Sequence, residues 1–245
     1  LARREVTAAL DRGDTHYPPN NGRPALRDAL SKYMDDAGLT FSADEVILTD
    51  GATEALSAAF MAMLNPGDEV IIPTPAFGLY ESIVVANHAK AVFLDTEPAQ
   101  FQIDEDALRA CVTPATKAIV ICSPNNPTGD VAPLDFVAAL CDACPGMVMV
   151  DEAYVEFADD SFGAATTAQG LIAEHSNLVI LHTLSKAFGA AGTRLGYVIA
   201  VPEVIDVFAA IRQIYSVNVL SQATALACVR ARDAYAPVVA QVASE

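Results

Sequence analysis

The stretch that decides the fold is residues 178–197, which read LVILHTLSKAFGAAGTRLGY. Its first four residues are all apolar, which is typical of a buried strand. Lys186 follows shortly afterwards, an unusual position for a lysine, because burial of an ammonium group is costly unless it is paired or chemically altered. Two interpretations are open from this stretch alone. The side chain extends to solvent from a helix start, or it is a desolvated amine that forms a Schiff base with a carbonyl compound.

Outward from this stretch, short apolar runs alternate with helical patterns along the chain. The expected strands are 46–49, 70–72, 91–94, 118–122, 147–150, 178–181 and 196–201. The expected helices are 25–36, 55–64, 77–87, 104–111, 134–144, 203–215 and 221–235. Apolar strands separated by helices predict an α/β fold in three layers, with a mostly parallel sheet and helices on both faces.

We expect the whole chain, 1–245, to form one large domain, because no low-complexity linker or internal repeat divides it. Within it, residues 1–40 are expected to form an N-terminal helix and loop region. Residues 41–215 would form the sheet core, and 216–245 the start of a helix that leads out of the domain.

Composition restricts the classes of partner. The chain has 31 acidic and 14 basic residues and a net charge of −17, which argues against nucleic acid and fits a saline habitat. No apolar run reaches the length of a membrane span, and the first residues lack the apolar segment of a signal peptide. We therefore expect a cytoplasmic protein with no membrane partner. Five cysteines include one isolated CxxC pair, Cys141 and Cys144, which we interpret as core residues rather than a metal site.

Polar residues gather where the expected strands end. In open α/β sheets ligands bind at the carboxyl ends of the strands. Four strand ends carry such groups: Gly51-Ala52-Thr53, Asn126, Asp151 with Tyr154, and Thr183-Ser185-Lys186. Together they fit one small ligand that carries an anion, a basic nitrogen and a carbonyl.

The anion would lie at the start of the helix that follows Gly51. The first N–H groups of a helix and its dipole attract anions, although an ordinary cap by Asp50 or Thr53 is the alternative. Arg194 could add a guanidinium to the same anion, or form only a surface ion pair. The glycines match neither a P-loop nor a dinucleotide-binding pattern.

Asp151 ends the apolar run MVMV, so its carboxylate is expected in a partly dry place. A carboxylate there stays ionised only with a cationic partner, and a protonated pyridine nitrogen would serve. Tyr154 would point the same way if a helical turn begins there. The alternative is a capping aspartate and a core tyrosine.

Taken as a set, five motifs resemble those of the class I/II aminotransferases, which are fold-type-I pyridoxal-phosphate enzymes. The motifs are YPPNNGxPxLR, DGATEA, SPNNPTG, VDEAYVEF and TLSKAFGAAGTRLGY, in matching order and spacing over nearly the whole chain. The combination of DEAYVEF, TLSKAFG and YSVNVLSQ is most similar to the histidinol-phosphate aminotransferase branch.

The resemblance implies roles for individual residues. Lys186 would hold pyridoxal 5'-phosphate as a Schiff base, and Asp151 would pair with the pyridine nitrogen. Asn126 and Tyr154 would hold the ring hydroxyl, and Phe77 would stack on the ring. The phosphate would be held by Ala52, Thr53, Thr183, Ser185 and Arg194. Tyr17 would reach the phosphate of the partner subunit, which implies a homodimer.

The implied reaction is transfer of an amino group between an amino acid, or a histidinol-phosphate-like amine, and a 2-oxo acid such as 2-oxoglutarate. The chain departs from the family pattern at both ends. We expect two parts of the family pattern to be missing, the N-terminal segment and the C-terminal small domain. In the family, the small domain supplies the arginine that binds the substrate's carboxylate or phosphate. A related decarboxylase of the threonine-phosphate type and a cofactor-binding fragment without turnover therefore remain alternatives.

Overall fold

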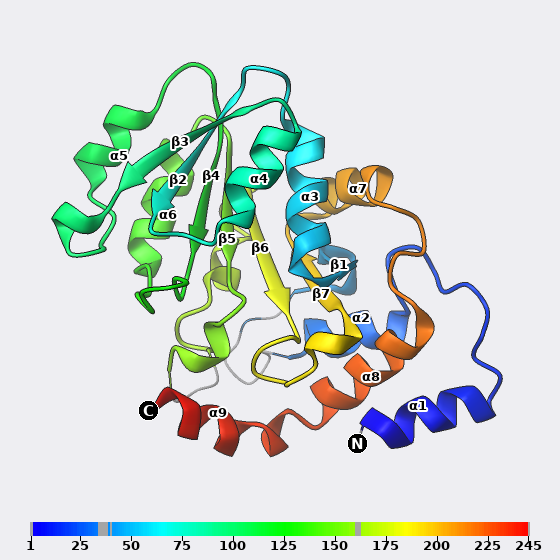
Figure 1. Ribbon diagram of the computed structural model, residues 1–245. Coiled ribbons are helices and arrows are strands. Elements are labelled where there is room, and N and C mark those ends of the chain that lie inside the picture. The colour runs from blue at the N-terminus through cyan, green and yellow to red at the C-terminus, as the bar shows by residue number, and fades with distance from the viewer. Residues whose placement is uncertain (1, 34–38, 40, 160–162, 245) are drawn as a thin grey trace.

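In the computed structural model, which describes residues 2–33, 39, 41–159 and 163–244, a seven-stranded sheet lies between two layers of helices (Figure 1). The strands are β1 Val46–Asp50, β2 Glu69–Thr74, β3 Lys90–Asp95, β4 Thr116–Cys122, β5 Met147–Asp151, β6 Leu178–Thr183 and β7 Leu195–Ile199. Their order is β1-β7-β6-β5-β4-β2-β3, and only the two pairings of β7 are antiparallel. The predicted three-layer α/β fold is confirmed.

The helices are α1 Ala2–Asp11, α2 Pro24–Ser31, α3 Gly51–Met63, α4 Leu79–Ala86, α5 Glu105–Cys111, α6 Leu134–Ala143, α7 Pro202–Ile211, α8 Val219–Arg230 and α9 Ala236–Ala243. Three expected helices end earlier than predicted. The one at 203–215 ends at Ile211, and the one at 221–235 ends at Arg230, after which α9 begins with a proline in its first turn. The one expected at 25–36 ends at Ser31, with Lys32 and Tyr33 in a turn, and residues 34–36 lie outside the described residues.

Each face of the sheet has its own apolar core. Along β6, Leu178 and Ile180 pack in the core shared with α2, α5, α6 and α8, while Val179 and Leu181 pack against α3, α4 and α7. A strand covered on both faces buries every side chain, whichever way it points. This explains why β6 reads as an unbroken apolar run.

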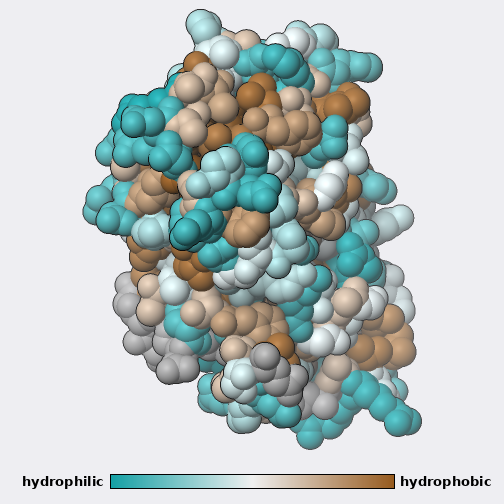
Figure 2. All heavy atoms as spheres, turned by 60° about the vertical axis from the view of Figure 1, so that its left-hand side comes forward, coloured by the Kyte–Doolittle hydropathy of each residue, from teal (hydrophilic) through white to brown (hydrophobic). Residues whose placement is uncertain are grey.

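The N-terminal helices lie against a helix from the last part of the chain. Helix α8 packs on α1 and α2, at the bottom of Figure 1. On the face turned forward in Figure 2, apolar residues are interspersed with hydrophilic ones. Within the described residues, no helix combines the length and apolarity that a membrane span requires.

The sheet topology brings the functional segments together. Strands β2, β4, β5 and β6 are parallel, so their carboxyl ends meet at one edge. Strand β7 runs the other way and therefore begins at this edge, with Arg194 directly before it. Antiparallel pairing also places Asp50, which precedes α3, opposite Leu195.

Candidate active site

A cavity of about 230 Å³ opens at this edge of the sheet. It is lined by Ala52, Thr53, Phe77, Asn126, Asp151, Tyr154, Thr183, Ser185, Lys186 and Arg194, together with Leu56, Tyr80, Cys122, Ala153 and Ala191. The structure thus brings together every site residue expected from the sequence except Tyr17. That ring is 81% exposed and stacks on Tyr215, with the ring centroids 4.6 Å apart.

Asp151 lies at the end of β5 with only 4% of its surface exposed. The backbone N–H of Ala153 donates to Oδ1 at 3.1 Å, and the hydroxyl of Tyr80 donates to Oδ2 at 2.7 Å. Burial raises the pKa of the Asp151 carboxyl above its ordinary value, while these two donors lower it. In the described part of the chain no cation forms an ion pair with Asp151, so a buried carboxylate faces the cavity without a cationic partner.

Tyr80 is a site residue that the sequence reasoning missed. It lies in the expected helix at a position that reads as core, and it is 1% exposed. Burial and the neighbouring Asp151 hold the pKa of its hydroxyl well above the ordinary value, so the hydroxyl remains a donor. The available signal was spacing: Tyr80 follows Phe77 by three residues, which places both on one side of a helical turn. Their rings meet edge to face at 5.8 Å.

Lys186 differs from the expectation of a desolvated amine. The residue is exposed, because it stands on a turn beyond the end of β6 and at the edge of the cavity. No helix begins there, so the alternative of a helix-starting lysine is also wrong in its local structure. Its Nζ lies 4.8 Å from the centroid of the Tyr154 ring, and it forms no ion pair with the residues described.

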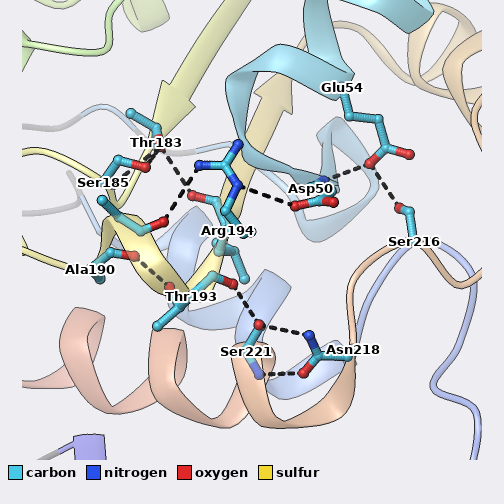
Figure 3. A network of polar contacts seen from close by, with 12 residues as sticks. Asp50, Glu54, Thr183, Ser185, Ala190, Thr193, Arg194, Ser216, Asn218 and Ser221 are labelled. Carbon is cyan, nitrogen blue, oxygen red and sulfur yellow. Dashed lines mark hydrogen bonds and ion pairs between the residues drawn. The ribbon is translucent and has the colours of Figure 1, made fainter.

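The start of α3 and Arg194 form the polar end of the cavity (Figure 3). The side chain of Asp50 caps none of the first N–H groups of α3, which removes the capping alternative for that residue. Arg194 Nε lies 3.7 Å from Asp50 Oδ1, and both side chains are about half exposed. An exposed pair of this kind contributes about 1 kcal/mol or less, so an incoming anion could replace Asp50 as the partner of Arg194.

Backbone geometry fixes this polar end. Arg194 has φ of +52°, a left-handed conformation that a residue with a side chain adopts at a cost. The turn is held by Ser221 of α8, whose hydroxyl donates to the carbonyl of Thr193 at 2.5 Å (Figure 3). No residue with a side chain fits at position 196, because a Cβ there would lie 2.5 Å from the backbone nitrogen of Ala52. The close approach of β7 to the start of α3 therefore depends on this glycine.

Further hydroxyl and amide groups border the cavity. The Thr183 and Ser185 side-chain oxygens lie 2.9 Å apart, beside Arg194 in Figure 3. Asn126 and Tyr154 also line the cavity, and neither side chain hydrogen-bonds to another described residue through its polar end. Their polar groups are therefore available to a ligand.

The whole chain matches one protein family. The family described as aminotransferase class I and II matches residues 1–244. The chain belongs to this family.

Relatives of this aminotransferase-family chain carry several names. A histidinol-phosphate aminotransferase of Methanococcoides burtonii is 40% identical over 79% of this chain and 50% of its own length. An aromatic amino acid aminotransferase of Mycolicibacterium vanbaalenii is 35% identical over 94% of this chain and 63% of its own. A mutant aspartate aminotransferase of Thermus thermophilus superposes with a TM-score of 0.85 at 31% identity, over 99% of this chain and 64% of its own. The chain therefore spans between half and two thirds of the length of these relatives.

The CxxC pair, Cys141 and Cys144, lies at the end of α6, away from the cavity. Cys141 is buried in the core, and burial raises the pKa of its thiol to about 12. Burial also raises the pKa of Cys144, and both thiols are free. Thiols that resist ionisation are poor nucleophiles and metal ligands, which agrees with their interpretation as packing residues.

Proposed function

We propose that this chain binds pyridoxal 5'-phosphate in the cavity beside Lys186 and catalyses amino transfer between an amine and a 2-oxo acid. The observation that carries the proposal is the arrangement of one cavity: an anion site at one end, a buried carboxylate with no cationic partner among the described residues, and a lysine amine at the edge. These three features match the phosphate, the pyridine nitrogen and the aldehyde of one cofactor. When bound, the cofactor supplies an aldehyde that condenses with amines and a ring that accepts electrons.

The phosphate would be held by the first N–H groups of α3 at Ala52 and Thr53. The hydroxyls of Thr183 and Ser185 and the guanidinium of Arg194 would complete this site. Backbone N–H groups at a helix start and a guanidinium both bind phosphate through charge-assisted hydrogen bonds. Arg194 would then exchange its weak partner Asp50 for a stronger one.

The ring would be oriented by groups around the middle of the cavity. Asp151 would pair with the protonated ring nitrogen, which supplies the cationic partner that the carboxylate lacks. Asn126 and Tyr154 would hold the ring hydroxyl through their free polar ends. Phe77 would cover one face of the ring, since it lines the cavity and is 44% exposed.

Lys186 would act through Nζ. As a free amine, Nζ is the base that removes the proton from the α-carbon of the substrate and later returns a proton. Its exposed position at the edge of the cavity leaves room for a substrate to approach. The phenol of Tyr154, with its ring 4.8 Å away, would orient the amine.

Histidinol phosphate or a similar amine is the proposed amino donor, with 2-oxoglutarate as an example of the acceptor. This choice is supported by the names of several relatives, and the aromatic and aspartate aminotransferases among them provide the competing substrates. We further propose a cytoplasmic homodimer in which Tyr17 reaches the partner's phosphate site. The described sheet and helices would be the large domain of a longer protein.

The test combines a spectrum with product analysis. Wild-type protein incubated with the cofactor should develop the near-visible absorbance of a cofactor bound covalently to a lysine, and Lys186→Ala should abolish it. Lys117→Ala is the matched control, because Lys117 is exposed on β4 and does not line the cavity. Persistence of the absorbance in Lys186→Ala would show that the lysine is misassigned.

Product analysis separates the possible reactions. With histidinol phosphate, aromatic amino acids or aspartate as donor, amino transfer yields a keto product and a new amino acid. Release of carbon dioxide would identify the decarboxylase alternative. A bound-cofactor spectrum without either product would identify a fragment that binds the cofactor but does not turn over.

A further inference from the structure

A second cavity lies beside the candidate active site and plays no part in the proposed reaction. Its volume is about 150 Å³, and it lies where β2 and β4 end. Tyr80 and Cys122 line both cavities and so form a shared wall. A cavity of roughly this volume accepts a molecule of the size of benzene.

The lining combines aromatic and aliphatic side chains with hydroxyl and amide groups and one carboxylate. Phe101, Ile103 and Phe136 contribute apolar surface. Asp130 is the one acidic residue among the lining residues, and its Oδ1 accepts a hydrogen bond from Gln102 Nε2 at 2.9 Å. No described cation forms an ion pair with Asp130. The negative charge at this cavity therefore lacks a positive partner among the described residues.

The loop that carries Phe101 is held in an unfavourable conformation. Gln100 and Phe101 have φ of +56° and +65°, a region in which each non-glycine residue costs free energy. The loop is closed by backbone hydrogen bonds from Phe101 N–H to the carbonyl of Thr96 (2.9 Å) and from Gln102 N–H to that of Ala99 (3.1 Å). The consequence of this conformation is that both Phe101 and Gln102 line the cavity.

From the unpaired carboxylate, the aromatic rings and the volume, we infer that this cavity binds a small primary amine with an aromatic or branched alkyl body. The body fills the space between Phe101 and Phe136, and the ammonium group pairs with Asp130. A cation beside an aromatic ring gains further attraction from the ring face. The net charge of −17 favours approach of a cation over an anion.

The test is a ligand-observed NMR titration of the cofactor-free chain, in which the amine has no aldehyde to react with. Phenethylamine, 2-phenylethanol and phenylacetate share one body and differ in charge. We expect phenethylamine to bind with Kd on the order of 1 mM. A partly exposed ion pair with an aromatic contact should make it about fivefold tighter than the alcohol, with phenylacetate weakest.

Variants locate the site. Asp130→Asn keeps an acceptor for Gln102 and should reduce phenethylamine to the affinity of the alcohol. Asp106→Asn removes the same charge from the exposed face of α5 and should change nothing. Phe101→Ala should weaken all three probes, and because Phe101 is 43% exposed, the fold should tolerate the change.

Three outcomes would overturn the inference. The probes could bind alike or fail to bind in the millimolar range. The preference for the amine could survive Asp130→Asn. It could instead disappear in Asp151→Asn, which would place the amine in the cofactor cavity. None of these outcomes bears on cofactor binding by Lys186, so failure here and failure of the proposed function are separate results.

Discussion

At the scale of single residues, the site depends on how one buried carboxylate is kept charged. Burial favours the neutral form of Asp151, and the hydroxyl of Tyr80 and the N–H of Ala153 oppose it. Hydrogen bonds to a charged group contribute about 1.5–3 kcal/mol, more than those between neutral groups. Tyr80 therefore prepares Asp151 to receive a cationic ring nitrogen.

Tyr80→Phe should weaken binding of pyridoxal phosphate by about tenfold at pH 7, in line with the loss of one such hydrogen bond. Without the hydroxyl the pKa of Asp151 rises further, so more of the carboxyl is neutral at a given pH. The deficit relative to wild type should therefore shrink as the pH increases and Asp151 ionises. Cofactor fluorescence titrations between pH 6 and pH 9 measure both effects.

The control for this variant is Tyr33→Phe. The hydroxyl of Tyr33 is also buried and donates to a carboxylate, Glu156 Oε1 at 3.3 Å, but its side chain packs in the core on the other face of the sheet. Loss of cofactor affinity in both variants would indicate a general effect on stability. Unchanged affinity in Tyr80→Phe would contradict the role given to Tyr80.

The residue types and spacing were sufficient to predict the cavity but not its details. Asp151, Asn126 and Lys186 stand out in the sequence because polar residues at or shortly after the ends of apolar runs are conspicuous. Tyr80 does not, because a tyrosine at a helical apolar position reads as core and its hydrogen bond is formed with a residue 71 positions away. The sequence left open whether Lys186 is exposed or desolvated, because the outcome depends on the turn beyond the strand.

At the scale of elements, a buried polar cluster joins β5 and β6 below the cavity. Glu152, directly after β5, accepts hydrogen bonds from the hydroxyl of Thr167 and the N–H of Ala168, both at 2.6 Å. His182 of β6 lies 3.1 Å from the same carboxylate and stacks on Tyr197 of β7. The cluster connects β5, which ends at Asp151, with β6, which ends shortly before Lys186.

The cluster also includes Glu156, in the short 3₁₀ helix Val155–Phe157, whose charged form is disfavoured by burial. Burial raises the pKa of its carboxyl to about 7, and the charge of Glu152 also raises it. His182, a backbone N–H and the hydroxyl of Tyr33 lower this pKa by smaller amounts. Among the described residues, Oε2 of Glu156 has no hydrogen-bond partner. Burial, and after it the charges of Glu156 and Glu152, hold the pKa of Tyr197 on β7 well above its ordinary value.

Glu156→Gln should flatten the pH dependence of stability. Burial raises the pKa of this carboxyl from its ordinary 4.5 to about 7, so between these values the folded state holds a proton that the unfolded chain releases; stability is therefore lost as the pH rises from 4.5 to 7 and stays lower above pH 7. The neutral glutamine should therefore gain about 2 kcal/mol relative to wild type between pH 5 and pH 8. Urea unfolding at both pH values measures the difference.

The matched control is Glu174→Gln, because Glu174 is exposed on the surface. This variant should keep the pH dependence of wild type. If Glu156→Gln loses stability equally at pH 5 and pH 8, the carboxyl does not titrate in this range, and the prediction is wrong.

The antiparallel direction of β7 could not be predicted from its own residues. The apolar run of β7 resembles those of the parallel strands, and an apolar run does not indicate in which direction a strand runs. The link from β6 to β7 is the informative feature, because residues 184–194 contain only a short 3₁₀ helix. A parallel crossover usually needs a dozen or more residues and an α-helix, so the short link favours the antiparallel pairing that the structure has.

At the scale of the whole molecule, the surplus of acidic residues dominates. The net charge of −17 is distributed over a chain of 245 residues, so like charges repel one another throughout the folded state. Salt screens this repulsion, because the Debye length falls from about 30 Å at 0.01 M to about 3 Å at 1 M. That salt weakens this repulsion follows from the composition alone and does not depend on how the chain folds.

Sodium chloride should therefore stabilise the chain at pH 8. Between 0.01 M and 1 M salt the free energy of unfolding should increase by on the order of 1 kcal/mol or more, with most of the gain at low salt, where the Debye length changes most. Urea is the denaturant to use, because guanidinium chloride is itself a salt. Near pH 4.4, the isoelectric point of the sequence, repulsion is small and the same titration should show little change. Equal salt effects at the two pH values would mean that the salt acts through the exclusion of ions from apolar surface rather than through charge, and a fall in stability at pH 8 would mean that attractive ion pairs outweigh the repulsion.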